Sequence, residues 1–513
     1  MTENVGRSHI WTVHPIIARV IAQAPGTAAA KDNPLGSSLA SVIHALVAAV
    51  LFIAFSSIYS VPATSAAGPE AAQEPEGLSL ERAFQISYEK NYQILQARAS
   101  LDAAQARLNQ AVAAFLPKLN LEAGYAYSNN PVMVFGNKMN QADFQMEDFQ
   151  LDTLNHPDFR GNYMARFILT QPVFNQGLEY IGYRAAKIQH EITSLSMRQA
   201  VQAALFQVEK AYCQALLAQD QVEALEMAFR TAKAHEALAE KRYNAGLVLK
   251  SDVLSARVQR GVVERELFRA RNDLKLAVAA LNQAMGLPQE TRWSLKGLDS
   301  ELEDEGRLSY WLDTARDSRP ELLMARKQQE LTEVQRRQAQ LRFLPAVNLH
   351  GMYENNRHNL AHMGGESWTF LATMSFNIFN GLGDFQGLKA ASAELEREQN
   401  RVRQMEAGIE LEVRKAYFDF KTAKKQLKVA KSAVEQAAES QKILKNRYEN
   451  GLALMVELLA ADTALRQEML NMAKAAFDSR IAWASLKWKA GILGGDLAPA
   501  SSRPAATEQG EMK

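Results

Sequence analysis

The residues that could carry out chemistry gather at few places in this 513-residue chain. His358 and His362 stand four positions apart, a spacing that two metal ligands can share, but they fall in a polar stretch that predicts a loop. Gly381–Gly387 invites comparison with a phosphate-binding loop, yet its glycines lack the GxGxxG spacing and no Lys-Ser/Thr pair follows. Cys213 is the single cysteine and is expected to pack inside a helix. We therefore expect no metal, no cofactor and no enzymatic activity.

Two further groups of residues suggest turns that are followed by acids. They are Gly246, Leu247 and Asp252 in one place, and Gly451, Leu452 and Glu457 in the other. Glycine permits the left-handed backbone that ends a helix, so each group predicts a reversal between two helices. An acid in the first turn of a helix is favoured by the helix dipole, which is the simplest explanation of both carboxylates.

Long helices are needed to hold these turns. Proline is absent from residues 173–287 and 346–498, and a proline inside a helix costs about 3 kcal/mol. Both zones are rich in good helix formers. The first zone has a seam typical of a coiled coil, with spacings of four and three: Val201, Leu205, Val208, Tyr212 and Ala215. A helix from about Leu178 to Arg242 would be roughly 95 Å long.

The chain also repeats itself. The matching segments are Phe115–Leu121 with Phe343–Leu349, Val173–Asn175 with Ile378–Asn380, and Arg242–Leu247 with Arg447–Leu452. The first pair is offset by 228 residues and the other two by 205, so the first copy has 23 additional residues between its first and second segments. These lie around residues 129–161, a polar and irregular stretch that we predict to be a loop. We interpret the pattern as an internal duplication.

Each copy has two strand-like stretches between these segments. In the clearest one, Trp368, Phe370 and Met374 alternate with Thr369 and Thr373. Such alternation is typical of barrel strands with lipid outside and a lumen inside, although a half-buried soluble sheet shows it too. Four strands cannot close a barrel, and open edges do not survive in lipid. We therefore expect three copies to give twelve strands, with the helices continuing as a tube.

The charge and the two ends of the chain set further limits. A net charge of +1 gives no basic surface for nucleic acid. An apolar run at residues 45–59, followed by small residues at 63–67, predicts a leader and signal peptide over residues 1–67, with a retained signal anchor as the alternative. Residues 494–513 are rich in Ala, Ser, Pro and Gly and predict a disordered tail.

The repeated Phe-Leu-Pro, Val/Ile-Phe-Asn and Arg-Tyr-x-x-Gly-Leu elements, with the segment Leu78–Ala83, resemble the TolC family of outer-membrane efflux proteins over Leu78–Leu493. The resemblance implies a mainly α protein with membrane β-strands. Four strands per protomer would complete a twelve-stranded barrel in a homotrimer, and long coiled-coil hairpins would form an α-barrel. The chain would consist of a first repeat (78–288), an equatorial linker (289–306) and a second repeat (307–493).

The same resemblance implies a passive exit duct. The duct would sit in the outer-membrane lipid with a long periplasmic extension and would serve efflux or type I secretion. It would receive drugs, metals or proteins from an inner-membrane pump through a periplasmic adaptor. The alternative is a periplasmic coiled-coil adaptor or scaffold without a pore, which would explain the signal peptide and the helices but not the paired amphipathic strands.

The resemblance also assigns sites. They are Gly246, Leu247, Gly451 and Leu452 as adaptor-contact tips, and Tyr448, Asp252 and Glu457 as the periplasmic gate. The family's basic gate residue falls on Ala453 and its second entrance acid on Ala460, so part of the lock is absent. Three carboxylates per trimer would attract cations more weakly than six. Plain turns and plain helix-capping acids are the alternatives.

Overall fold

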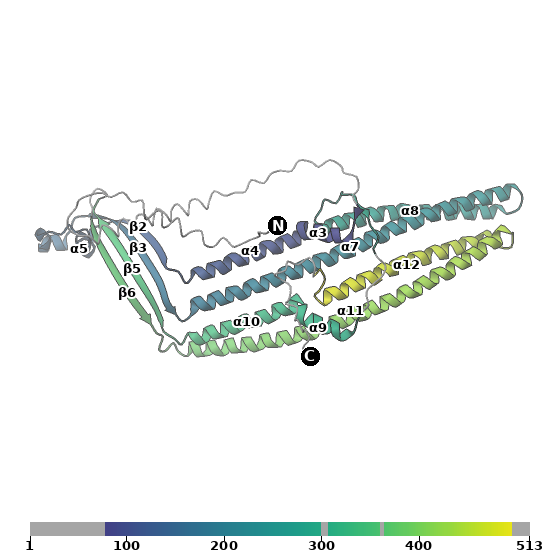
Figure 1. The fold of residues 1–513 in the computed structure, drawn as a ribbon. Helices are drawn as coiled ribbons and strands as arrows, with labels where there is room; N and C mark the ends of the chain where they lie inside the picture. The colour runs from purple at the N-terminus through teal and green to yellow at the C-terminus, as the bar shows by residue number, and fades with distance from the viewer. Residues whose placement is uncertain (1–76, 299–305, 360–363, 495–513) are drawn as a thin grey trace, which may run out of the picture. The chain divides into compact units, whose positions relative to one another are not determined.

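The computed structural model describes residues 77–298, 306–359 and 364–494. All of them belong to one compact unit, which runs from Pro75 to Lys513. The expected leader and signal peptide (1–67), His362 and all but the first residue of the expected tail (494–513) lie outside the described residues. Helices make up most of the described chain (Figure 1).

Strands and helices follow one another in a similar order twice. The first half contains β1 (Gly77–Leu78), α3 (Leu80–Lys90), α4 (Tyr92–Ala113), β2 (Lys118–Ser128), α5 (Pro131–Asn140), η1 (Met146–Phe149), α6 (Leu151–Asn155), β3 (Arg160–Asn175), α7 (Leu178–Asn244) and α8 (Lys250–Met285). The second half contains β4 (Ser294–Leu295), α9 (Leu308–Ser318), α10 (Pro320–Leu341), β5 (Ala346–Arg357), β6 (Gly365–Ser375), α11 (Gly383–Glu449) and α12 (Met455–Lys489).

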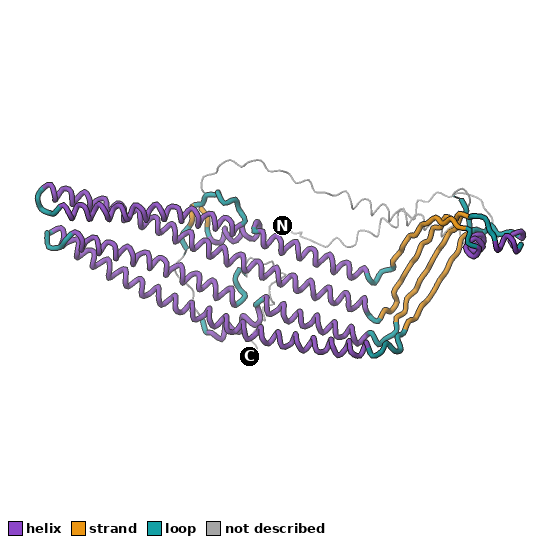
Figure 2. Tube along the Cα trace, turned by 180° about the vertical axis from the view of Figure 1, so that it is seen from behind, coloured by secondary structure: helices purple, strands orange, loops and turns teal. Residues whose placement is uncertain are grey.

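The two longest helices, α7 and α11, contain 67 residues each and are therefore about 100 Å long. The prediction of a helix from Leu178 to about Arg242 is confirmed. α7 packs along α8, and α11 along α12, so that each pair forms an antiparallel helical hairpin. Figure 2 shows the strands gathered at one end of these helices and the two hairpin turns at the other. Over the described residues, no helix combines the length and the apolarity needed to cross a membrane.

All five residues of the predicted seam on α7 are buried. Tyr212 also connects the helix to the short parallel pair of β1 and β4, since its Oη lies 2.8 Å from the carbonyl oxygen of Leu78 and 2.7 Å from that of Lys296. Tyr417 is the matching residue of α11, and its Oη lies 3.3 Å from the carbonyl oxygen of Gly306. A buried hydroxyl needs such a partner, so both tyrosines fix a linker segment to a long helix.

The strands β2, β3, β5 and β6 form one antiparallel sheet in that order. Lys118 pairs with Thr170 in the first strand hairpin, and Ala346 pairs with Ser375 in the second. These positions correspond under the sequence offsets of 228 and 205 residues, so the two strand hairpins have the same register. The predicted strands are confirmed, and β2 and β6 form the edges of the described sheet.

The additional residues of the first half contain the three short helices α5, η1 and α6, so the prediction of an irregular loop around 129–161 is wrong. Asn130 caps α5 by accepting the N–H of Met133 on its Oδ1 at 3.2 Å, and Pro131 stands at the first helical position. These start signals are hidden in the sequence by the polar composition around them. Gln141 ties the insertion to the sheet, because its Nε2 donates to the Oδ1 of Asn162 at 2.9 Å.

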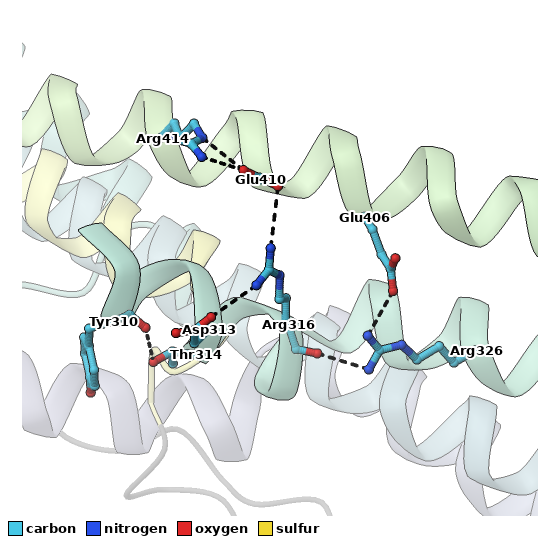
Figure 3. A network of polar contacts seen from close by, with 8 residues as sticks. All are labelled: Tyr310, Asp313, Thr314, Arg316, Arg326, Glu406, Glu410 and Arg414. Carbon is cyan, nitrogen blue, oxygen red and sulfur yellow. Dashed lines mark hydrogen bonds and ion pairs between the residues drawn. The ribbon is translucent and has the colours of Figure 1, made fainter. Parts of the chain in front are cut away.

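In the middle of the second half, α9 and α10 pack on α11. Trp311, Phe420 and Trp483 form a buried aromatic cluster there, with ring centroids 4.9 to 5.4 Å apart. Outside it lies a polar network in which an Nη2 of Arg316 comes 3.7 Å from an Oε2 of Glu410 (Figure 3). Solvent-exposed ion pairs contribute little, so the aromatic cluster supplies most of the stabilisation.

Candidate functional site

One face of the sheet is mainly apolar and open to its surroundings. A row of side chains crosses all four strands from Leu121 through Phe167 and Tyr353 to Trp368. In this row Leu121 is 59% exposed, and beside it Phe370 is 80% exposed. Soluble proteins seldom expose so continuous an apolar surface, which marks contact with a membrane or a partner.

The opposite face of the sheet is polar and charged. The Nε of Arg166 lies 2.8 Å from an Oε2 of Glu354, and its Nη1 lies 3.6 Å from an Oε2 of Glu122. Nearer the insertion, the Nδ2 of Asn162 donates to the Oδ1 of Asn356 at 2.7 Å. Ionised groups of this kind belong beside water rather than lipid. The predicted alternation of apolar and polar side chains along the strands is therefore confirmed.

The two helical hairpins turn in the same way. Gly246 and Gly451 both have φ of +72°, the left-handed conformation that ends a helix. In each turn the following leucine N–H donates to a carbonyl five residues earlier, at 2.9 Å in the first turn and 2.8 Å in the second. Leu247 is 74% exposed and Leu452 is 69% exposed. The predicted helix reversals are confirmed, and adaptor contact at these leucines stays a prediction.

The two acids near the turns cap the helices that follow. An Oδ2 of Asp252 accepts the N–H of Leu249 at 3.2 Å at the start of α8. An Oε2 of Glu457 accepts the N–H of Leu454 at 3.0 Å at the start of α12. Each carboxylate therefore satisfies a backbone group that the helix leaves over, as the dipole explanation expects. A role of either acid in a gate stays a prediction.

Tyr448 lies between the two helical hairpins near their turns. It is 2% exposed and packs with Ala239 of α7, Val253 of α8 and Met455 of α12. Burial raises the pKa of the Tyr448 hydroxyl, and the neighbouring charge of Arg242 opposes this shift. Tyr448 therefore joins the hairpins mainly through packing.

Arg242 is a contact residue that the sequence analysis did not single out. Its Nη1 donates to the carbonyl oxygen of Tyr448 at 3.0 Å, and its Nη2 donates to that of Glu449 at 3.0 Å. The guanidinium carbon also lies 4.7 Å from the centroid of the Tyr448 ring. Arg242 thus ties the end of α7 to the end of α11. The available signal was that both copies of the repeated tip segment begin with arginine.

A second set of polar contacts joins the hairpins away from the turns. The Nε2 of His235 lies 2.8 Å from an Oδ2 of Asp462, and the Nε2 of Gln441 donates to the other carboxylate oxygen at 2.9 Å. The Nε2 of Gln259 donates to the Oγ1 of Thr463 at 3.2 Å. These groups line a cavity of about 220 Å³ between the hairpins. The hairpins of one chain are therefore connected over several helical turns.

The residues first considered for chemistry are placed in structural roles. Burial raises the pKa of the Cys213 thiol to about 12, which leaves it unreactive. Gly381 and Leu382 both adopt the left-handed conformation, with φ of +68° and +66°, immediately before α11, so this segment is a joint between sheet and helix. Within the part of the chain that the structure describes, no three His, Cys, Asp or Glu side chains are grouped to hold a metal ion.

A two-faced sheet continued by helical hairpins of about 100 Å defines the class of a membrane channel protomer with a helical extension. The chain belongs to the outer membrane efflux protein family, whose model matches residues 84–287 and 311–491. The family is one of efflux proteins rather than enzymes, and it places the chain in the outer membrane. The predicted membership of the TolC family is thereby confirmed.

Individual proteins agree with this assignment. The chain is 24% identical over 338 residues to the alkaline protease secretion protein AprF of Pseudomonas aeruginosa, covering 65% of this chain and 70% of AprF. It is 24% identical over 431 residues to the outer membrane protein TolC of Escherichia coli, covering 81% and 82%. The crystal structure of the Campylobacter jejuni CmeC outer membrane channel has the same fold, with a TM-score of 0.69 at 15% identity over 84% of this chain and 93% of CmeC.

Proposed function

We propose that the chain is one protomer of a homotrimeric exit duct in the outer membrane, through which cargo passes passively. One observation carries this proposal: the sheet has an apolar face, a charged face and two edge strands, β2 and β6. Strand edges do not persist in lipid, so the edges of one copy pair with those of others. Twelve strands from three copies would close a barrel with a lumen lined by the charged face.

An internal duplication supports the pairing between copies and gives its register. Within the chain, β3 pairs with β5 so that Arg166 is opposite Glu354. Under the two repeat offsets this pair corresponds to Leu371 on β6 and Ala126 on the β2 of a neighbouring copy. We infer this register because the two strand hairpins already match under the same offsets. Both residues belong to the charged face, which aqueous reagents would reach.

Disulfide formation between copies tests the barrel. With Cys213→Ala as background, Leu371→Cys combined with Ala126→Cys should give linked dimers and trimers, since directly opposed residues lie about 4.5–5.5 Å apart. The control combines Leu371→Cys with Glu122→Cys, four residues along the strand and about 13 Å away. Linkage in the control alone would refute the register. Linkage in neither variant, with the protein inserted in membranes, would refute the closed barrel.

We further propose that the hairpin tips meet a periplasmic adaptor, through which an inner-membrane pump delivers cargo for efflux or type I secretion. Exposed Leu247 and Leu452 at the two turns support this contact, since each presents apolar surface where the helices end. The similarity to AprF, named for alkaline protease secretion, and to the CmeC channel supports the export function.

We place the periplasmic gate at Tyr448, Asp252 and Glu457. Tyr448 supports this placement because it is packed between the hairpins beside the turns, where any separation of the helices would expose it. The two acids lie at the starts of the returning helices, next to the same turns. With alanine at 453 and 460, closure would depend on packing around Tyr448 more than on ion pairs.

Single-channel recording in planar bilayers tests the duct and the gate separately. The unmodified protein should give small steady conductance steps, and Tyr448→Phe and Asp252→Ala should enlarge them. Asp313→Ala, at an exposed carboxylate on α9, is the matched control and should change nothing. Unchanged steps in all variants would keep the duct and reject the gate residues. No conductance from inserted trimers would reject the duct in favour of a scaffold without a pore.

A further inference from the structure

The two hairpin tips have matching sequences but different surroundings. Tyr243 and Tyr448 are the tyrosines of the repeated Arg-Tyr-x-x-Gly-Leu segment, yet Tyr243 is 43% exposed and Tyr448 is 2% exposed. Leu254 and Leu459 correspond in the same way just beyond the turns, and they are 48% and 8% exposed. The covered residues of the second tip lie against the first hairpin of the same chain. The first tip presents the equivalent surface to its surroundings.

Arg242 shows how the covered surface is held. It donates to the last two carbonyls at the end of α11, those of Tyr448 and Glu449, and lies over the Tyr448 ring. The final carbonyls of a helix have no partner within it and lie at the negative end of its dipole, so a guanidinium is well suited to bind them. The aromatic face adds a cation–π contact.

The equivalent arginine and its equivalent acceptors lie on separate surfaces of the chain. Arg447 stands in the second tip at the position of Arg242, and its Nη2 donates to the carbonyl oxygen of Leu452 in its own turn at 3.3 Å. The carbonyls that correspond to those held by Arg242 belong to Tyr243 and Asn244 at the end of α7. The Tyr243 oxygen accepts the N–H of Gly246 at 2.9 Å and has a second lone pair for another donor.

We propose that Arg447 binds the end of α7 in a neighbouring copy of the chain, where it donates to the carbonyls of Tyr243 and Asn244 and covers the Tyr243 ring. The contact inside the chain, between the first and second hairpins, is the template for this contact between copies. The inference rests on the proposed trimer and goes beyond it. It adds three arginine clasps between copies to the three within them, all at the end of the hairpins where the gate is placed.

The two kinds of clasp would have different consequences. Loss of Arg242 loosens two hairpins that remain joined in one chain through β3–β5 pairing and the contacts of His235 and Gln259. Loss of Arg447 separates neighbouring copies at their tips. Arg447→Ala should therefore enlarge single-channel conductance steps, and Arg447→Lys should do so less, because lysine retains the charge but cannot donate to two carbonyls in a fixed fork.

Photocrosslinking distinguishes a contact between copies from one within a chain. With p-benzoylphenylalanine at position 243, which keeps an aromatic ring there, irradiation should give linked dimers and trimers. The same residue at position 448 should give links within one chain. Arg447→Ala should lower the yield of linked dimers from position 243 several-fold, and the matched variant Arg242→Ala should leave that yield unchanged.

Two outcomes would overturn the clasp. Links from position 243 that stay within one chain would do so, as would a dimer yield that Arg447→Ala does not lower in protein that still migrates as a trimer. The cysteine pair at 371 and 126 separates this failure from that of the duct. Trimers linked through the strands without dimers from position 243 would reject the clasp alone, and absence of both would reject the trimer.

Discussion

The sheet and the helical hairpins follow opposite rules of burial. On the helices, Tyr212 and Phe420 are completely buried, and most charged side chains lie outside. On the sheet, Phe370 is 80% exposed, whereas the side chain of Glu354 is only 12% exposed beside Arg166. The same residue types are thus placed for two different surroundings. The comparison indicates that the apolar face of the sheet meets hydrocarbon and that the helices meet water.

The largest effect is expected in the helical part, at Phe420. Its ring is fully buried, 4.9 Å from the ring of Trp483, so Phe420→Ala should lower the free energy of unfolding by about 3–5 kcal/mol. Phe418 stands two positions earlier on α11 and is 55% exposed, so Phe418→Ala should stay within about 0.5 kcal/mol. Urea unfolding of the purified protein, followed by circular dichroism, measures both. Equal losses would show that α11 buries a different face.

The next effect is expected on the apolar face of the sheet, at Phe370. Phe370→Arg puts a charge on the face assigned to lipid and should lower stability in bilayers by about 2–4 kcal/mol. Thr369→Arg, one residue earlier and on the opposite face, should cost much less. Guanidinium-induced unfolding from lipid vesicles measures the two variants. If they lose the same amount, the two faces do not differ in their surroundings.

A smaller effect concerns pH and the buried Glu209 of α7. Burial raises its pKa above the ordinary 4.5, and the Nε of Arg480 at 3.2 Å opposes the shift. The native state therefore holds this proton more tightly than the unfolded state. Below pH 4.5 the group has no effect on stability, and stability falls as pH rises from there through the raised pKa. Relative to Glu209→Gln, the unmodified protein should lose stability over that range.

Glu410 provides a control of opposite sign for this pH measurement. Its hydrogen bond to Arg414 lowers the pKa of the carboxyl, so its contribution to stability is present above the ordinary pKa and is lost as pH falls. Unfolding free energies measured at several pH values should therefore diverge in opposite directions for Glu209→Gln and Glu410→Gln. Parallel trends would mean that Glu209 is not shielded from water.

The smallest effect is expected at the exposed network around α9. The side chain of Arg316 is 55% exposed and pairs with Asp313 at 3.2 Å and Glu410 at 3.7 Å (Figure 3). Arg316→Ala should change the free energy of unfolding by about 1 kcal/mol or less, and added salt should reduce the difference. A loss as large as that of Phe420→Ala would contradict the view that packing dominates the helical part.

The sequence was sufficient for the features that depend on periodicity. Proline-free zones and the seam through Tyr212 located the long helix α7, and alternation around Phe370 located the strands. The repeat offsets also anticipated the common register of the two strand hairpins. Each of these features is set by residue types at regular spacing, which a single sequence displays.

The features that the sequence did not reveal depend on backbone atoms and on position within the duplicated chain. Arg242 binds carbonyl oxygens, which are present at every residue, so no pattern marks its acceptors. Tyr243 and Tyr448 have the same sequence context but different exposure, because only one of them lies against another hairpin of the same chain. The short helix α5 depends on a local cap at Asn130, whose signal is weak beside the polar residues that follow.

The equal length of α7 and α11, at 67 residues each, also fixes an angle. Each residue added to an α-helix turns everything beyond it by about 100°. A single insertion between Tyr212 and Arg242 would therefore swing the arginine away from the end of α11, although the hairpin would grow by only about 1.5 Å. Changes in length are compatible with closed tips only when they restore the angle, in steps close to seven residues, and when both hairpins change together.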